Sequence, residues 1–269
     1  MYTTVRTCFL DKHDNTIFNQ KMQLTYPSHH SWTKDISAGI EIDFSGRAAK
    51  KIHHSLPRLE EAGVTYRIEP LTEHFFNDFL PLYTNQIGAK DNALLHDVVE
   101  KTLHNKSHDF PYYSFSLWEH GEFIGGTIFS LRTDKVSYAF RVFVTDWNQS
   151  NLKASPALIG EYVIAEFATK EGKKFLSHGK DRNPYGINAA IGLATFKLSV
   201  GCKATVATGS ETRTIDTTTI DTDCLILEQP TEGDVITNAR LVTSRDTYEK
   251  YIQVTKYPNL LSVEVLFRD

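Results

Sequence analysis

Residues 146–156 read Asp-Trp-Asn-Gln-Ser-Asn-Leu-Lys-Ala-Ser-Pro and link an expected strand to an expected helix. Ser155 is a favourable N-cap residue, and Pro156 suits the first helical position because an N–H there would have no helical partner. Gly172 suits the left-handed residue that ends many helices, so the pattern predicts a helix over Pro156–Glu171. The N-terminus of such a helix gathers unpaired N–H groups and partial positive charge. It either holds a phosphate or is an ordinary capped helix.

Two further motifs follow this helix. Residues 178–185 read His-Gly-Lys-Asp-Arg-Asn-Pro-Tyr, and residues 192–201 read Gly-Leu-Ala-Thr-Phe-Lys-Leu-Ser-Val-Gly. A short apolar run precedes the first motif and predicts a strand over Lys174–His178. Apolar residues at helical spacing in the second motif predict a helix over Asn188–Ser199.

Three closely spaced strands precede the Pro156 helix and read as an antiparallel meander. Strict alternation places Tyr138 and Arg141 on opposite faces of the third strand. The order of elements is strand, two helices, three antiparallel strands, helix, strand, helix and strand, which predicts an α/β (α+β) fold with a mixed, largely antiparallel sheet flanked by helices. The strands are Val64–Pro70, Tyr112–Trp118, Phe123–Leu131, Val136–Val144 and Lys203–Ala207, and the two early helices begin at Thr72 and near Asp91.

The two ends of the chain add further elements. We expect a hairpin from Val5–Leu10 and Ile17–Leu24, a strand over Gly39–Phe44, and a basic amphipathic helix from Ser45 to just before Gly63. After residue 209, strands are expected at Cys224–Glu228, Val235–Thr243 and Leu261–Phe267. The chain therefore divides into an N-terminal extension packed on the core (1–63), the core (64–208) and a strand-rich C-terminal extension (209–269).

Composition narrows the class of protein. The 269 residues carry 29 Lys and Arg against 33 Asp and Glu, and the formal charge of −4 gives no global attraction to nucleic acid or anionic membrane, although a local basic patch is compatible with it. We see no secretory leader and no apolar run of the ~20 residues that a membrane span needs. Three widely separated cysteines and adjacent rather than spaced histidines predict no metal site. Reduced thiols in a cytoplasmic protein are the simplest interpretation.

This order of elements resembles the GNAT superfamily of acyl-CoA-dependent N-acyltransferases, and in particular its FemABX-like branch, which includes acyltransferases of polysaccharide pathways. The resemblance rests on Gly125-Gly126, on residues 152–155, on residues 192–201 and on the basic segment 47–54 before Ala62-Gly63-Val64. It covers about half the chain. The Arg/Gln-x-x-Gly-x-Gly/Ala loop of typical members is absent, and the chain is too short for two complete GNAT-like halves.

The resemblance implies where an acyl donor would bind. Backbone N–H groups of five residues would hold the pyrophosphate of acyl-CoA: Asn151, Leu152, Lys153, Ala154 and Ser155. The side chain of Lys153 adds a point charge or is an ordinary loop lysine. Backbone groups near Phe143 and Val144 would pair with the pantetheine arm, and Lys197 would reach a cofactor phosphate.

Acylation of an amine also needs a group that removes a proton. His178 titrates near neutrality and could be this base, with Asp181 fixing its orientation and Tyr185 returning a proton to the departing thiolate. The alternative is a structural loop in which Asp181 caps a turn. Tyr138 and Arg141 are the residues expected to bind the acceptor, or else a core tyrosine and a surface arginine.

We therefore predict an acyl-CoA-dependent N-acyltransferase, with acyl-CoA as co-substrate and no metal. The acceptor is the primary amine of a small molecule, and an amino sugar, nucleotide-linked or not, is preferred by analogy with the branch. No nucleic-acid partner and no membrane span are expected, and a homodimer is left open. The alternatives are an aminoacyl-tRNA-dependent transferase of the FemABX kind and a non-catalytic module that binds a partner.

Overall fold

A computed structural model describes residues 22–268 except 42–43, 90–93, 105–108 and 148–150. The elements follow the chain in this order, with η marking 3₁₀ turns: β1 (Gln23–Pro27), β2 (His29–Asp35), α1 (Gly46–Ser55), η1 (Leu56–Arg58), β3 (Val64–Pro70), α2 (Glu73–Gly88), α3 (Val98–Thr102), β4 (Tyr112–Glu119), β5 (Glu122–Leu131), β6 (Lys135–Phe143), α4 (Pro156–Lys170), β7 (Phe175–Arg182), α5 (Ile191–Ser199), β8 (Lys203–Val206), β9 (Thr212–Asp216), η2 (Thr217–Thr219), β10 (Cys224–Leu227), β11 (Val235–Ile236), β12 (Asn238–Thr243), α6 (Arg245–Tyr251), η3 (Ile252–Lys256) and β13 (Ser262–Phe267). The predicted hairpin of Val5–Leu10 and Ile17–Leu24 lies almost entirely outside the described residues.

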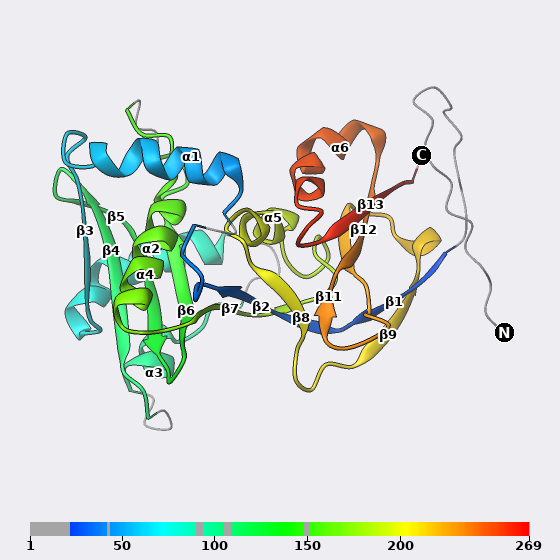
Figure 1. The fold of residues 1–269 in the computed structure, drawn as a ribbon, viewed down its shortest axis with the longest axis horizontal. Helices are drawn as coiled ribbons and strands as arrows, with labels where there is room; N and C mark the ends of the chain where they lie inside the picture. Colours follow the sequence, from blue (N-terminus) through cyan, green and yellow to red (C-terminus); the bar gives the residue numbers. More distant parts are fainter. Residues whose placement is uncertain (1–21, 42–43, 90–93, 105–108, 148–150, 269) are drawn as a thin grey trace.

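The main sheet has eight strands in the order β11-β8-β2-β7-β6-β5-β4-β3 (Figure 1). Strands β4 to β6 form the predicted antiparallel meander, β3 adds to it antiparallel to β4, and β6 and β7 are the parallel pair within this sheet. The predicted mixed, largely antiparallel sheet is confirmed. Strand β7 runs on to Arg182, four residues beyond the predicted end, so most of the His178–Tyr185 motif is strand and not loop.

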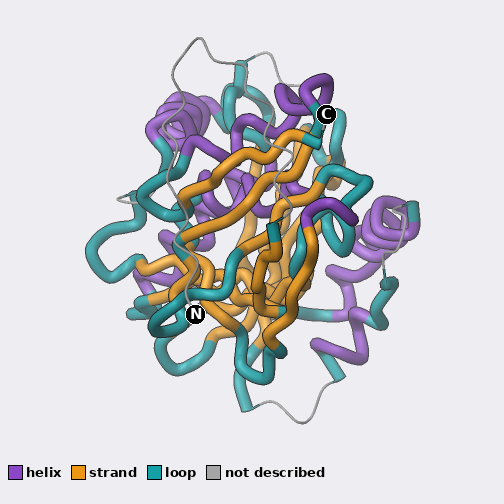
Figure 2. Tube along the Cα trace, turned by 90° about the vertical axis from the view of Figure 1, so that its right-hand side faces the viewer, coloured by secondary structure: helices purple, strands orange, loops and turns teal. Residues whose placement is uncertain are grey.

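Helices cover both faces of this sheet (Figure 2). Neighbouring residues of β5 show the division, because Phe129 belongs to the core cluster that includes α1 and α4 whereas Ile128 belongs to the cluster beneath α2. The apolar side of α2 contributes Phe76, Phe79 and Tyr83 to the second cluster. Tyr138 of β6, Leu176 of β7 and the buried residues of α4 all belong to the first cluster.

Strand β2 is the main element that the sequence pattern conceals. It inserts between β7 and β8 and pairs antiparallel with both, so the predicted N-terminal extension supplies an inner strand of the main sheet. Its buried alternate residues are His30, Trp32 and Lys34, and two of these are polar. A period-2 pattern of apolar residues is therefore missing, although the period-2 pattern of burial is present.

The predicted strand over Gly39–Phe44 is wrong. Residues 37, 38, 40 and 41 form turns, and Gly39 has a φ of 131°, a conformation that glycine reaches without strain. Val235–Thr243 is also divided rather than continuous, because β11 pairs with β8 whereas β12 joins a different sheet. The helix expected near Asp91 is short and begins after Asp97, whose side chain accepts from the Glu100 amide.

A β-bulge in β6 makes the predicted strict alternation of its side chains wrong. Ile128 pairs with Phe140 and Phe129 pairs with Tyr138, so Ala139 is an extra residue without a partner on β5. An extra residue reverses the side-chain alternation beyond it. Tyr138 and Arg141 consequently lie together, with the Arg141 guanidinium carbon 4.5 Å from the centre of the Tyr138 ring, and not on opposite faces.

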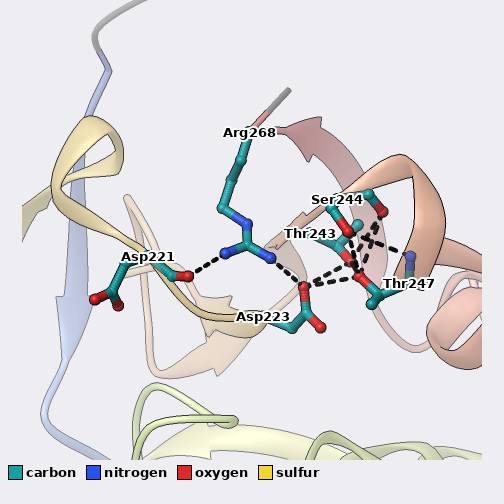
Figure 3. A network of polar contacts seen from close by, with 6 residues as sticks. All are labelled: Asp221, Asp223, Thr243, Ser244, Thr247 and Arg268. Carbon is teal, nitrogen blue, oxygen red and sulfur yellow. Dashed lines mark hydrogen bonds and ion pairs between the residues drawn. The ribbon is translucent and has the colours of Figure 1, made fainter.

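The C-terminal residues form a three-stranded sheet, β10-β12-β13, in which β12 and β13 are parallel. A polar network fastens this unit (Figure 3). One Asp223 oxygen accepts from Arg268 at 2.6 Å and from the hydroxyls of Thr243 and Thr247 at 3.0 Å each, and Arg268 also contacts the Asp221 carbonyl. The end of β13 is thus tied to the start of α6 and to the loop before β10.

Gly125-Gly126 allow close approach of strands. Gly125 has a φ of 145°, and a Cβ there would collide with the Val142 carbonyl and the Phe143 backbone. We predict that Gly125→Ala lowers the free energy of unfolding by about 2–4 kcal/mol, measured by urea denaturation. Gly192→Ala is the control, because a Cβ at that helical position meets nothing within 4 Å. Equal effects of the two substitutions would contradict the steric argument.

Candidate functional site

The site lies where β6 and β7 separate. The parallel pairing covers only Lys135–Ser137 of β6 and Phe175–Ser177 of β7, although both strands continue beyond it. Past the last pair, β7 stays paired with β2 up to Arg182. The space between the diverging strands is filled by side chains of β6, β7 and the helix α4 that connects them.

A buried carboxylate organises these side chains. Glu161 of α4 has no exposed surface, and its two oxygens accept from different strands. Arg141 of β6 donates to one oxygen and His178 of β7 donates through Nε2 to the other, both at 2.9 Å. Tyr138 packs on the His178 ring with centroids 4.5 Å apart. The side chain of His178 is 3 % exposed and that of Arg141 is 20 % exposed, so Arg141 is the more exposed partner of Glu161.

The charges of this cluster follow from burial and contact. Burial opposes ionisation of Glu161, but its bonds to His178 and Arg141 outweigh burial and lower its pKa to about 2. Burial lowers the pKa of His178 below its usual 6.5, and the Glu161 charge only partly offsets this shift. Burial and the same carboxylate raise the pKa of Tyr138 well above 10. Near pH 7 the cluster thus holds a carboxylate, a guanidinium and a neutral imidazole.

A second polar cluster lies next to the first. Asp181 accepts from Tyr185 and from the Lys197 ammonium, both at 2.5 Å. The Tyr185 oxygen is in turn 2.8 Å from the Trp32 indole nitrogen and 2.9 Å from His30 Nε2. Tyr185 has one proton, which it gives to Asp181, so both β2 residues must donate to the tyrosine oxygen.

The pKa shifts in this second cluster agree with those proton positions. Burial lowers the pKa of His30 to about 4, so its ring is neutral with the proton on Nε2. Burial, together with the Asp181 charge, raises the pKa of Tyr185 far above 10 and keeps its hydroxyl protonated. Burial lowers the pKa of Lys197, and Asp181 opposes that shift. Lys197 also contacts the His178 carbonyl at 3.3 Å, which joins the two clusters.

The structure gathers six of the predicted residues in these clusters, namely Tyr138, Arg141, His178, Asp181, Tyr185 and Lys197. One detail of the prediction is wrong: Glu161, and not Asp181, holds the His178 ring. Sequence reasoning missed Glu161, His30 and Trp32. Glu161 could have been found, because it is a lone acid among the apolar residues of 156–165.

The predicted pyrophosphate site needs correction at two positions. Ser155 caps α4 as expected, and its side chain accepts from the Leu158 amide. The amides of Lys153 and Ala154, however, donate to the hydroxyl of Ser55, the last residue of α1, at 2.8 and 2.9 Å. Ser55 is fully buried. Two of the five amides assigned to an anion are therefore occupied by the protein itself.

The backbone groups predicted to bind the pantetheine arm also have partners within the protein. The Phe143 carbonyl accepts from the Gln86 side chain of α2 at 2.7 Å. The Val144 amide donates to the Ile124 carbonyl at 2.9 Å. Lys197 lies inside the second cluster, with a side chain 5 % exposed and an ion pair to Asp181, so its assigned role as a phosphate ligand stays a prediction. Asn151 and Leu152 also remain predictions.

Within the described residues, no group of three or more His, Cys, Asp or Glu side chains could hold a metal ion. In the same part of the chain, no helix has the length and apolar character to cross a bilayer. Cys202 and Cys224 are free and buried, and Cys8 lies outside the described residues.

A meander, a parallel pair that separates and a connecting helix at the separation together define the GNAT fold, and this chain has that fold. The structure of FemX matches with a TM-score of 0.50 at 12 % identity, over 68 % of this chain and 61 % of that chain. A conserved protein of unknown function from Bacteroides thetaiotaomicron matches with a TM-score of 0.46 at 13 % identity, over 74 % and 63 %.

The C-terminal domain of a putative lysylphosphatidylglycerol synthetase from Agrobacterium fabrum matches with a TM-score of 0.42 at 12 % identity, over 60 % of this chain and 48 % of that chain. This chain thus spans about half to three fifths of the length of the first structures that it matches. At such identities the likeness shows the fold alone. No family model matches the sequence, and no curated protein matches it.

The Glu161 cluster predicts an acid-sensitive stability. The pKa of Glu161 is lowered in the folded state, so its stabilisation is complete above the unfolded-state value of about 4.3 and is lost as pH falls towards 2. We expect Glu161→Gln to lower the free energy of unfolding at pH 7 by about 3–5 kcal/mol, because the largely buried guanidinium of Arg141 loses its carboxylate partner. The variant should also flatten the pH dependence between 4.5 and 2.5, followed by urea denaturation. An unchanged slope would contradict the assignment.

Proposed function

We propose that this protein is an N-acyltransferase that acylates the primary amine of a small molecule at the separation of β6 and β7. The observation that carries the proposal is a neutral, buried histidine held by a buried carboxylate at that position of a GNAT fold. A hydrogen bond to a carboxylate fixes the proton on His178 Nε2 and leaves Nδ1 as the nitrogen that can accept a proton.

The chemistry assigns a role to each side chain. His178 removes a proton from the acceptor ammonium, and Glu161 stabilises the imidazolium that forms. The free amine then attacks the acyl carbon, and the bond from that carbon to the sulfur or oxygen of the carrier breaks. The leaving atom takes up the next proton of the attacking nitrogen, and the imidazolium releases its proton to solvent. Arg141 is partly exposed and carries further N–H donors, which suit the carbonyl oxygen as negative charge develops on it. Tyr185 stays protonated and orients Asp181, which holds the Lys197 ammonium against the His178 backbone.

The donor is the finer part of the proposal. Acyl-CoA is the donor that the fold's usual members would use, and an amino sugar remains the preferred acceptor by analogy. Acyl-CoA binding through α4 would require Ser55 and Gln86 to release the amides and the carbonyl that they occupy. Because these amides and this carbonyl are already hydrogen-bonded within the protein, the structure supports the second candidate, an aminoacyl-tRNA donor. The carrier of that donor does not need a pyrophosphate site at α4.

A transfer assay tests the function and distinguishes the donors. The purified protein is given [¹⁴C]acetyl-CoA in one arm and tRNA charged with a labelled amino acid in the other, with amino sugars, amino acids and peptides as acceptors. We expect transfer to an amine in one arm, and His178→Gln should lower kcat by about 10²–10⁴-fold while donor affinity is kept. Lys250→Ala, on the exposed surface of α6, is the control. Equal turnover by wild type and His178→Gln would exclude His178 as the base.

Ser55 offers a separate test of the acyl-CoA route. Ser55→Ala removes the acceptor from two amides at the start of α4, so a diphosphate could take its place. If CoA enters there, its affinity should rise about tenfold, the effect of one displaced hydrogen bond. Calorimetry with CoA measures this change, and Ser37→Ala on the surface is the control. Unchanged or absent CoA binding in Ser55→Ala would exclude α4 as the diphosphate site.

A further inference from the structure

The strongest feature that the proposed mechanism does not use is the outer edge of β3. This strand ends the eight-stranded sheet, and Figure 1 shows it at the outer margin with β4 on its inner side. All seven residues of β3 pair with β4 without a register shift, so the edge carries no bulge. The strand at the opposite end of the sheet, β11, has two residues. A long, unbulged edge is a template for a further strand.

Alternate backbone groups of β3 point away from β4. The Leu71 amide, just after the strand, donates to the Tyr112 carbonyl of β4 at 3.0 Å, so the odd-numbered residues bond to β4. In an antiparallel pair the N–H and C=O of one residue point to the same side, and those of its neighbour point to the other. The outward groups are therefore the N–H and C=O of Tyr66 and Ile68 and the C=O of Pro70. Within the described residues no strand pairs with this side of β3.

The side chains of β3 divide between the two faces of the sheet. Tyr66 stacks on Phe115 with ring centroids 6.2 Å apart, and Ile68 packs against the same core cluster, so both lie on the α4 face. Side chains alternate along a strand, which places Arg67 and Glu69 together on the other face. Both are exposed, and in the part of the chain that the structure describes neither forms an ion pair.

We propose that β3 pairs with β3 of a second copy of this chain, antiparallel and about a two-fold axis at Ile68. The main sheets of the two copies then form one continuous sheet. In this register the two Ile68 residues exchange N–H···O=C bonds, and each Tyr66 amide donates to the Pro70 carbonyl of the other copy. Pro70 has no N–H to donate, but its carbonyl faces the partner strand.

The charges select this register. Two-fold registers centred on Tyr66 or Arg67 would make the same number of backbone hydrogen bonds. Centring on Arg67 sets the two guanidiniums opposite each other, and centring on Tyr66 sets each guanidinium opposite Thr65. Centring on Ile68 sets each Arg67 opposite the Glu69 of the other copy, at a non-hydrogen-bonded position where facing side chains lie closest. Charges on an edge strand usually prevent pairing, and here they leave one register favourable.

The other face of the paired strands is apolar. In the same register Tyr66 lies opposite Pro70 of the other copy, and the two Ile68 side chains lie opposite each other. Tyr66 is 43 % exposed in the single chain, so pairing would cover one of its large exposed apolar side chains. A strand of unrelated sequence could use the backbone groups but would not match both charges and this apolar row. A second copy therefore fits the edge best.

Sedimentation velocity of the full-length protein tests the proposal across a concentration series. The interface of one strand is small, so we expect reversible dimerisation with a Kd of about 1–100 μM. The variant E69R sets like charges opposite each other twice and should raise the Kd about tenfold or more. The exchange variant R67E/E69R restores opposite charges only in the register centred on Ile68, and it should recover the dimer. Circular dichroism checks that each variant is folded.

The matched control is Glu249→Arg, which makes the same change of charge at an exposed position of α6. It should dimerise as the wild type does. A protein that stays monomeric throughout the series would leave the edge to a foreign strand and overturn the proposal. A dimer unaffected by E69R, or one that R67E/E69R does not recover, would overturn it as well. Acyl transfer by a strictly monomeric protein would leave the proposed function standing and remove only the dimer.

Discussion

The ionised carboxylate of Glu161 is the constraint around which the site is built. It is fully buried, so it is tolerated only because a guanidinium and an imidazole bind its two oxygens. Those partners come from β6 and β7, the two strands that separate. The single negative charge of Glu161 on α4 therefore binds a side chain from each of the two strands and orients the ring of His178 on β7.

Strand β2 completes this arrangement from the other side. Its Trp32 and His30 donate to the Tyr185 oxygen, the Tyr185 hydroxyl donates to Asp181, and Asp181 also accepts from Lys197. The two clusters meet where Lys197 contacts the His178 carbonyl. A polar interior of this kind specifies one arrangement of strands more sharply than an apolar one would.

The sequence predicts those parts of the fold in which a single period dominates. The meander and α4 carry clear apolar patterns and cap residues, and they form as expected. The buried face of β2 is His30, Trp32 and Lys34, so its burial follows from partners on other strands that no local pattern reveals. The bulge at Ala139 is likewise fixed by pairing with β5, and it decides that Tyr138 and Arg141 meet. Candidate side chains could be named from residue type. The hydrogen bond between His178 and Glu161, and those from the Lys153 and Ala154 amides to the Ser55 hydroxyl, depend on tertiary contacts that the sequence does not reveal.

The position of β2 has a consequence for how the chain assembles. Its neighbours in the sheet, β7 and β8, begin at Phe175 and Lys203, so the segment His29–Asp35 emerges from the ribosome about 140 residues before either exists. At roughly 5–20 residues per second, it waits on the order of ten seconds with its strand edges unsatisfied. Long-range closure of this sort slows folding and exposes a nascent chain to wrong pairings. The lysine and two histidines within this strand give the waiting segment the polarity that discourages self-association.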